Sequence, residues 1–522
     1  MKNFYFLIAV LCLLFTIGQA NAQNTRIVKV NGWDGTGDIE SFNNVLSEAI
    51  DNDSTERKIN PNVIFELKPG QVYPQGMTIR NYDYHLHIKA EEGTGPKPII
   101  MPGKMANGNY GAKFIISFNH VTLDGIELSG HTPTGGVLNR MFEFSGNSFR
   151  CVVNNCHLDG DRGALIALFG DSASVFLSDS KFGNTGHRIT SGGNGRTIDF
   201  RPTALYVDTL VVQNCTHYSQ TDRLIRNMGT VVNYLKWDHN SAINNVGFHG
   251  SLQLGDVKEA YVTNNIFANS ISLGHYDART QEQTQPEKFF SVISLNGTSI
   301  TNQVVVVRNN NIYSDQALID VWAKYDSVSA PLAITPTVED KIGAANVNNA
   351  WFSEPLSFNS FCGPISDYVD AFLSNPAASS FPENWCVGGD GGYYPEEIDA
   401  SYGTTANSYT KADNGFPLGD LNFYPERKTA WLKWNSGDSL TNTVDETILT
   451  GNAIKMYPNP ANSVLNFSST VETVIIYSLD GKFLKSANKV NAISISDLKT
   501  GIYFVNIISD DIKTIQRVVV SR

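Results

Sequence analysis

The chain has 522 residues, a formal net charge of −12 and only 17% charged residues. Phosphate binding needs a basic surface, so this charge argues against nucleic acid as a partner. An acidic protein can still carry a local basic strip, which keeps an acidic polysaccharide among the candidate partners. The length suggests two to four domains, although elongated β folds can run longer as one unit.

Residues 1–22 are predicted to be a secretory signal peptide. A lysine precedes an apolar stretch over residues 4–15, and the Ala-Asn-Ala run at 20–22 supplies small residues for cleavage. The apolar stretch is shorter than the ~20 residues that a membrane-spanning helix needs. The mature protein is therefore expected to begin near Gln23, with no membrane-spanning segment after signal removal.

Residues 38–50 have apolar side chains at helical spacing. Asp38 or Ser41 can serve as the N-cap. We expect this segment to be a capping helix, because a stack of short strands exposes unpaired edges at its ends. The apolar residues of the predicted helix are Phe42, Val45, Leu46, Ala49 and Ile50.

Seven short segments repeat through the middle of the chain. Each holds an apolar residue, a polar pair rich in Asn and Asp, a small residue and a second apolar residue. Asn and Asp tolerate the left-handed backbone, so the pattern is typical of a short strand that turns a corner. The starts differ by 30, 24, 35, 25, 25 and 45 residues and fall at Leu123, Val153, Leu177, Val212, Trp237, Val262 and Val307.

Strands this short cannot bury a face alone, but stacked at the ~4.8 Å strand spacing they bury one continuous core. The repeat therefore predicts an all-β chain with a right-handed parallel β-helix over residues 23–347. A β-propeller is the alternative, but the smallest step is too short for a four-stranded blade. Equivalent positions on successive coils would form an internal ladder of Cys156, Ser180, Cys215, Asn240, Asn265 and Asn310.

The first coils carry a resemblance to a known family. Residues 63–70, 86–90 and 98–103 resemble the first coils of pectate-lyase-like β-helix proteins. The implied fold is the same parallel β-helix, but a resemblance in fold does not extend to the reaction.

Residues 348–435 are expected to form a C-terminal extension or cap, with a short helix from Pro364 to Leu373. A disulfide is expected between Cys362 and Cys386, on either side of this helix. Residues 414–428 resemble a stretch of uncharacterised secreted β-helix proteins and should fold back along the helix with their aromatic side chains buried. The remaining mature cysteines are expected to be small buried groups: Cys151, Cys156 and Cys215.

A polar linker is expected at residues 436–450, followed by a separate domain at 451–522. This domain contains Tyr-Pro-Asn-Pro-Ala at 457–461, a hairpin at 475–482 and a strand at 501–507. These motifs resemble the type A C-terminal sorting domain of the type IX secretion system of Bacteroidota. The resemblance implies a small β-sandwich, the type IX machinery as a partner and a location outside the outer membrane. An ordinary small β-sandwich is the alternative.

Basic residues concentrate between Lys181 and His249, and Arg201, Arg223 and Arg226 fall on consecutive coils. A polysaccharide lyase needs cations to neutralise a uronate carboxylate and a base to remove the C5 proton. The predicted catalytic residues are Arg201, Arg223, Arg226 and His239. The predicted substrate-binding residues are Lys181, Arg188, Arg196 and Lys236.

A structural role for these residues is the alternative. The arginines could pair with Asp199 and Asp222 on neighbouring coils. His239 could simply be a turn residue.

A calcium ion is a candidate cofactor, and Asp159, Asp161 and Asp171 form the best oxygen cluster. The fold resembles that of chondroitinase-B-like and alginate-lyase-type enzymes. Their Lys-Ser pair after acidic metal ligands does not occur in the coils, so no catalytic residue is carried over from them. Two functions therefore fit the sequence: a secreted or surface-attached lyase for a uronate-containing polymer, and a non-catalytic glycan-binding or adhesive protein.

Overall fold

The computed structural model describes residues 25–435 and 456–521, apart from 133, 135, 187–193, 228, 248, 277–290, 296, 298–301, 326–327, 362–363, 376–397, 460, 479–482 and 510–511. The chain forms two compact units, one ending at Phe423 and one beginning at Tyr424. The expected signal peptide, the Cys362–Cys386 disulfide and the linker lie outside the described residues.

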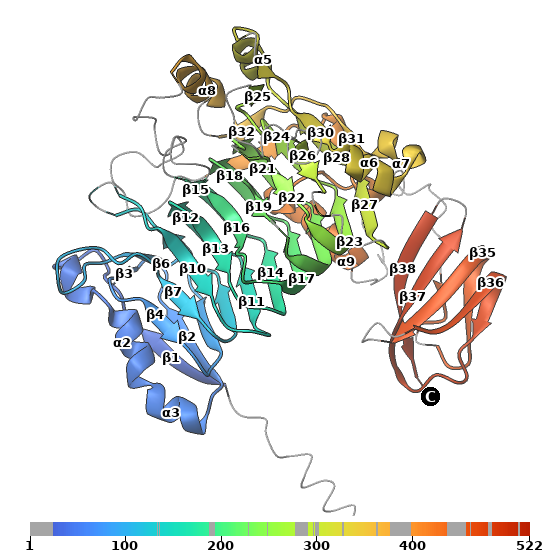
Figure 1. Cartoon of the computed structure of the whole chain (residues 1–522). Helices are drawn as coiled ribbons and strands as arrows, with labels where there is room; N and C mark the ends of the chain where they lie inside the picture. Colours follow the sequence, from blue (N-terminus) through green and yellow to red (C-terminus); the bar gives the residue numbers. More distant parts are fainter. Residues whose placement is uncertain are drawn as a thin grey trace, which may run out of the picture. The chain divides into compact units, whose positions relative to one another are not determined.

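Three long parallel sheets make up most of the first unit (Figure 1). Sheet A contains β1 (Arg26–Val30), β2 (Val63–Leu67), β5 (Leu86–Ala90), β8 (Val121–Asp124), β11 (Arg150–Asn154), β14 (Ala173–Ser178), β17 (Tyr206–Gln213), β20 (Val231–Asp238), β23 (Asp256–Thr263) and β27 (Val304–Arg308). Sheet B contains β3 (Val72–Gln75), β6 (Ile99–Pro102), β9 (Glu127–Ser129), β12 (His157–Asp161), β15 (Lys181–Thr185), β18 (Thr216–Gln220), β21 (Ser241–Asn245), β24 (Ile266–Ala268), β28 (Asn310–Tyr313) and β31 (Trp351–Phe352). Sheet C contains β4 (Ile79–Asn81), β7 (Ile115–Ser117), β10 (Arg140–Phe144), β13 (Ala164–Leu168), β16 (Arg196–Phe200), β19 (Ile225–Arg226), β22 (Leu252–Gln253), β26 (Ser291–Ser294) and β30 (Leu332–Ile334).

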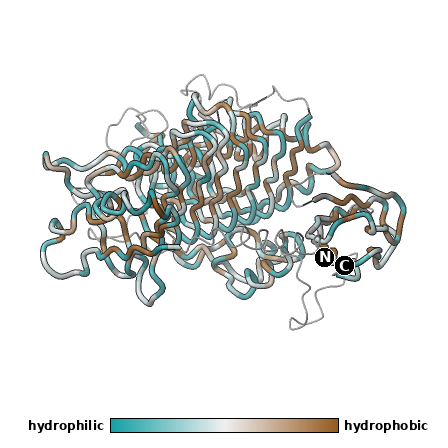
Figure 2. Tube along the Cα trace, turned by 90° about the horizontal axis from the view of Figure 1, so that it is seen from below, coloured by the Kyte–Doolittle hydropathy of each residue, from teal (hydrophilic) through white to brown (hydrophobic). Residues whose placement is uncertain are grey.

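The chain passes through sheets A, B and C in turn, which makes the right-handed parallel β-helix that the repeat predicted and excludes a propeller. The seven repeat starts lie side by side in sheet A, from Leu123 opposite Val153 to Val262 opposite Val307. Apolar and polar residues alternate along successive coils in Figure 2. One continuous apolar core runs through the stack, from Val30 to Ala350.

The turn from sheet A to sheet B uses a left-handed residue on coil after coil: Asn155, Asp179, Asn214, His239, Asn264 and Asn309. The next residue on each coil belongs to the predicted ladder. The side-chain oxygen of Asn240 accepts from the Cys215 N–H at 3.0 Å, and that of Asn265 accepts from the Asn240 N–H at 2.9 Å. Asn310 continues the ladder to Asn265. The predicted ladder is therefore confirmed, and it satisfies backbone groups that no sheet partner reaches.

Helices close both ends of the stack. At the N-terminal end, the 3₁₀ helix η1 (Ile39–Phe42) is capped by Asp38, and α2 (Val45–Asn52) places Leu46 and Ile50 in the core. The predicted single helix is broken, because Asn44 has a left-handed backbone with φ 70°. A further helix, α3 (Ser54–Ile59), follows. At the other end, α6 (Pro336–Ile342) and α7 (Ala344–Ala350), which the sequence did not predict, cover the last coil.

The C-terminal part of the first unit contains α5 (Gln316–Trp322), the predicted short helix α8 (Ile365–Ser374), and two strand pairs. The pairs are β25 (His275–Tyr276) with β29 (Val328–Ser329), and β32 (Phe358–Ser360) with β33 (Asp399–Tyr402). Short 3₁₀ turns follow as η4 (Asn407–Tyr409), η5 (Asp413–Gly415) and η6 (Leu421–Phe423).

Residues 411–423, here called the strap, run back along the corner between sheets A and B. The Gly419 N–H donates to the Asn264 carbonyl at 2.9 Å, and the Asn422 amide donates to the Asn214 carbonyl at 2.8 Å. Gly419 has φ 78°, and a Cβ there would lie 2.5 Å from the Ser241 Oγ, so only glycine fits this close approach. The strap confirms that residues 414–423 of the predicted stretch fold back along the β-helix, whereas residues 424–428 belong to the second unit.

The second unit contains α9 (Pro425–Asn435) and an antiparallel sheet of β34 (Met456–Tyr457), β35 (Val464–Ser478), β36 (Phe483–Ser494), β37 (Gly501–Ser509) and β38 (Ile512–Val520). Alternate residues of these strands, such as Val474, Ile476 and Val505, form a separate apolar core. The pattern fits strands with one buried face. The described residues of the predicted small β-sandwich form this one antiparallel sheet.

Replacing Asn265 with Ala should lower the free energy of unfolding by about 2–4 kcal/mol, because buried groups lose their partners. The Asn265 side chain accepts from the Asn240 N–H and donates to the Trp237 carbonyl at 3.0 Å. Denaturant unfolding checks this result. Asn348, exposed on α7, is the matched control, and its change to Ala should have little effect. Equal stability of the two variants would contradict the role of the ladder.

Burial raises the pKa of Asp420 in the strap to about 7. In the folded protein the Asp420 carboxyl therefore keeps its proton up to about pH 7, whereas in the unfolded chain it releases the proton near pH 4. Stability from this group is present below pH 4 and is lost as the pH rises through 7. Between pH 5 and pH 8 the free energy of unfolding should therefore fall by about 2–4 kcal/mol less in Asp420→Asn than in the parent protein. Denaturant unfolding across this range tests it, with exposed Asp340→Asn as control; parallel pH profiles of Asp420→Asn and the parent would contradict it.

Candidate functional site

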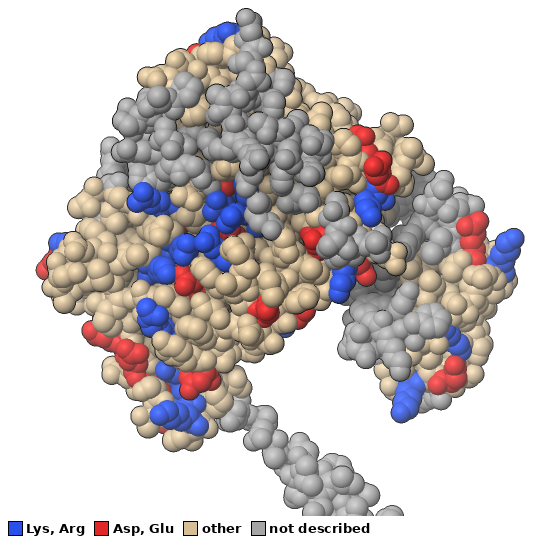
Figure 3. All heavy atoms as spheres, in the orientation of Figure 1, with Lys and Arg blue, Asp and Glu red and all other residues tan. Residues whose placement is uncertain are grey.

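Four of the predicted arginines lie on or beside two neighbouring strands of sheet C. Arg196 and Asp199 lie on β16, and Arg201 follows that strand. Asp222 and Arg223 lead into β19, which ends at Arg226. In Figure 3, Lys and Arg atoms gather over the part of the face where Figure 1 labels β10, β13, β16 and β19. We call Arg196, Arg201, Arg223 and Arg226, with their two aspartates, the arginine cluster.

Asp199 is the centre of one half of the cluster. Its carboxylate lies 3.4 Å from Arg196 Nη1, 3.0 Å from Arg201 Nη1 and 3.2 Å from Arg226 Nη1. Strand pairing explains the convergence, because Asp199 and Arg226 are direct neighbours in sheet C. The side chains of Arg201 and Arg226 remain 27% and 22% exposed, whereas Asp199 is buried. The two arginines can therefore reach a ligand while the carboxylate holds them in place.

Asp222 is the centre of the other, buried half. Arg196 Nε lies 2.8 Å from its carboxylate, His249 Nδ1 lies at 3.1 Å and Arg223 Nε at 3.6 Å. Burial alone would raise the pKa of Asp222, but Arg223 and Arg196, with help from His249, outweigh burial and hold that pKa well below its usual range. Asp222 is therefore ionised under all ordinary conditions and anchors the buried guanidinium groups.

The ion pairs confirm the expectation that the arginines contact Asp199 and Asp222. Among the described residues, the cluster brings four guanidinium groups to two carboxylates. The side chains of Arg201 and Arg226 stay partly exposed on a protein whose net charge is −12. A basic spot on an acidic surface attracts anions locally.

An aromatic column lies on the same side of the stack. Four strands of sheet C are each followed, at the same register, by one residue of this set: Tyr82, Phe118, Phe169 and Arg201. The Tyr82 and Phe118 rings stack at 4.9 Å, and both are exposed. The guanidinium groups of Arg140 and Arg201 each lie 5.5 Å from the Phe169 ring centre. Sequence reasoning missed this column, although an aromatic residue directly after an apolar strand was a signal that could have revealed it.

Three predicted site residues lie elsewhere. Lys181, on β15 of sheet B, donates to the Ile398 carbonyl at 3.0 Å and lies over the Phe423 ring. Lys236, on β20 of sheet A, pairs with Asp238 at 3.2 Å. His239 is fully buried at the corner between sheets A and B. These residues are therefore not part of the arginine cluster, and Arg188 lies outside the described residues.

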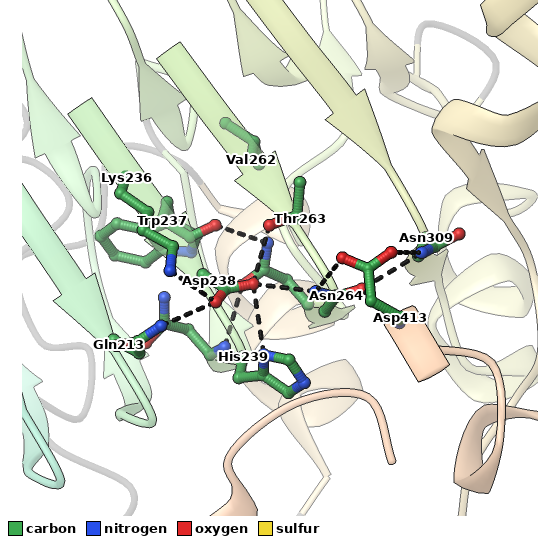
Figure 4. Close-up of polar contacts among 12 residues, drawn as sticks. Gln213, Lys236, Trp237, Asp238, His239, Val262, Thr263, Asn264, Asn309 and Asp413 are labelled. Carbon is green, nitrogen blue, oxygen red and sulfur yellow. Dashed lines mark hydrogen bonds and ion pairs between the residues drawn. The ribbon is translucent and has the colours of Figure 1, made fainter. Parts of the chain in front are cut away.

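Asp238 organises the surroundings of His239 (Figure 4). Its carboxylate accepts from Gln213, Thr263 and Asn264 at 2.7–2.9 Å, and His239 Nδ1 lies at 3.2 Å. Asn264 in turn donates to Asp413 of the strap at 3.2 Å. Burial alone would raise the pKa of Asp238, but His239, Lys236 and the Thr263 hydroxyl lower it well below its usual value. This network supports the reading of His239 as a turn residue that fixes the corner.

The acidic residues proposed for calcium do not form one cluster. Asp159 and Asp161 lie on β12, where Asp161 accepts from the Gly163 N–H at 2.5 Å. Asp171 instead accepts from the N–H groups of Leu205 and Tyr206. Within the described residues, no group of three or more His, Cys, Asp or Glu side chains could hold a metal ion.

The three cysteines expected to be buried groups are Cys151, Cys156 and Cys215, and all three are buried and free. Burial raises the pKa of each thiol, that of Cys156 to about 12. A thiol with so high a pKa is a poor nucleophile. The prediction of a structural role is therefore confirmed.

Comparison with known families identifies the C-terminal tail. Residues 455–521 match a family described as a secretion system C-terminal sorting domain. The tail is a type IX sorting domain, and the protein is exported to the cell surface or the medium. A comparison with curated proteins found no match. In the described part of the chain, no helix has the length and apolar character needed to cross a bilayer. The assignment to Bacteroidota and to pectate-lyase-like proteins remains a prediction.

Changing Asp199 to Asn should lower the free energy of unfolding by about 3 kcal/mol, because three guanidinium groups lose their shared counter-charge. Sulfate should restore part of this loss by occupying the cluster as an anion. Thermal unfolding with and without sodium sulfate measures both effects. Asp208→Asn, an exposed change on β17, is the control for the general stabilisation by sulfate. An equal gain from sulfate in both variants would argue against an anion site.

Proposed function

We propose that the protein binds an acidic polysaccharide outside the cell, along the face of sheet C. The observation that carries this proposal is the partly exposed pair Arg201 and Arg226 on the same side of the stack as the exposed rings of Tyr82 and Phe118. The sorting domain supports it, because the binding face of an exported protein meets extracellular polymers. The proposal favours the glycan-binding function over the lyase.

The arrangement suits an extended sugar chain. Guanidinium groups bind carboxylates and sulfates through paired hydrogen bonds. Aromatic rings offer apolar faces for the C–H groups of a sugar ring. From Tyr82 to Arg201, equivalent positions span four coil steps, or about 19 Å at the strand spacing. A chain of several sugar units can therefore contact aromatic residues at one end and arginines at the other.

Catalysis by the arginines themselves is disfavoured. A general base must be unprotonated at the working pH, whereas a guanidinium beside a carboxylate keeps its proton. Arg196, Arg201 and Arg226 all contact Asp199 as the cationic partners of a carboxylate. Their geometry supports binding and orientation of an anionic ligand.

An eliminating lyase is the second candidate function, and one observation favours it. His249 Nδ1 lies 3.1 Å from Asp222 Oδ1, and a carboxylate at this position orients an imidazole as a base. Arg201 and Arg226, which are partly exposed in the other half of the cluster, would neutralise a uronate. If the protein is a lyase, His249→Gln should abolish the unsaturated product and leave polymer binding in place.

The test of the proposed function is incubation of the chain from Gln23 onward with pectic, alginate and glycosaminoglycan polymers. Retention on at least one acidic polymer without new ultraviolet absorbance supports binding alone. Absorbance from an unsaturated uronate supports the lyase. No retention and no product on any of these polymers would contradict both functions.

Replacing both Arg201 and Arg226 with Gln should weaken binding to the retained polymer by about 10–100-fold and flatten its dependence on salt, because exposed charges act through screened electrostatics. Asp199 keeps Arg196 as a partner in this variant, so the fold should survive. Lys258→Gln, exposed on β23, is the matched control and should bind like the parent. Unchanged affinity of the arginine variant, measured by calorimetry at several salt concentrations, would place the binding face elsewhere.

A further inference from the structure

A second candidate site lies away from sheet C, at the end of two sheet B strands. An open cavity of about 470 Å³ is bordered by the ends of β21 and β24 and by α5, β32 and α8. This volume falls in the range of about 300–1,000 Å³ that is typical of small-molecule sites. The residues that matter for its chemistry are Asn244, Asn269, Asp315, Phe358 and Phe361.

The polar side of the cavity is fixed before any ligand arrives. Asn244 and Asn269 have left-handed backbones, with φ 57° and 53°, at equivalent turns of neighbouring coils. The Asn269 amide donates to Asn244 Oδ1 at 3.1 Å and to Asp315 Oδ2 at 2.7 Å. The Asp315 N–H donates to Asn269 Oδ1 at 2.8 Å. This network holds the Asp315 carboxylate at the cavity, and no cation among the described residues pairs with it.

The walls are equally well anchored. Leu318 of α5 and Ile365 of α8 belong to one apolar cluster with Val246 and Leu273 of the β-helix corner. Leu318 and Ile365 line the cavity, as do Phe358 and Phe361, whose ring centres are 5.9 Å apart. A site built on packed elements of this kind keeps its shape, which favours specific binding.

We propose that this cavity binds a small uncharged carbohydrate, of one or two sugar units. The hydroxyl groups of a sugar both donate and accept hydrogen bonds, so they match amide and carboxylate groups, while its C–H face packs on phenylalanine rings. Among the described residues that line the cavity, none is Lys, Arg or His, and the Asp315 carboxylate repels anions. The cavity therefore selects against the acidic ligands that suit the arginine cluster.

The proposal does not depend on the function assigned to sheet C. Its observations lie on sheet B and the helices beside it, and its ligand has no negative charge. The protein could bind a neutral sugar here whether or not an acidic polymer binds at the arginine cluster. The two sites would let one exported protein contact two different glycans.

The experiment is saturation-transfer NMR and calorimetry of the chain from Gln23 onward with glucose, galactose, mannose, xylose, N-acetylglucosamine and galacturonate, each at about 10 mM. At least one neutral sugar should bind, and galacturonate should bind about tenfold more weakly than galactose. If none of the neutral sugars binds, the proposal is wrong.

Two variants on the same helix locate the binding. Ala317 is exposed and lines the cavity, so Ala317→Trp fills the space without removing a polar contact and should weaken sugar binding at least tenfold. Ile319 is exposed on α5 but does not line the cavity, so Ile319→Trp should bind like the parent. Binding that persists in Ala317→Trp, in a protein with unchanged thermal stability, would overturn the assignment of this site.

Discussion

The structure depends on one backbone constraint, the left-handed residue that turns each coil from sheet A into sheet B. A positive φ is unfavourable for most residues, and Asn and Asp are among those that adopt it most readily. Asn214, His239 and Asn264 occupy this position on successive coils, and the ladder asparagines behind them bond the backbone of the preceding coil. Because turn and ladder recur together from Asn155 to Asn310, these coils are held in one register.

That register creates the arginine cluster. Asp199 and Arg226 are far apart in sequence, yet strand pairing makes them neighbours in sheet C. The buried arginines require carboxylates, since an unpaired buried charge is strongly destabilising. Asp199 and Asp222 meet this requirement among the described residues, while Arg201 and Arg226 stay partly exposed. The same interactions that allow the arginines to be buried thus also present two of them to a ligand.

Some features of the structure were predicted from the sequence at the level of single residues, and others were not predicted. The repeat starts paired as predicted because turn chemistry marks each coil of sheet A. Sheet C has no such turn residues, and some of its strands, such as β19, are very short. The aromatic column of Tyr82 and Phe118 was therefore not predicted from the sequence. Lys181, Lys236 and His239 were grouped with the arginines because they are close in sequence. A coil of about 25 residues visits all three sheets, so closeness in sequence does not place side chains on one face.

The central claim is that the face of sheet C receives an acidic sugar chain. Hydrogen exchange measured with and without a saturating acidic oligosaccharide, of the class that the protein retains, tests this claim most directly. The account predicts slower exchange in β10, β13, β16 and β19 and in the turns that carry Phe118 and Phe169. Protection confined to sheet A, or to the second unit, would contradict it.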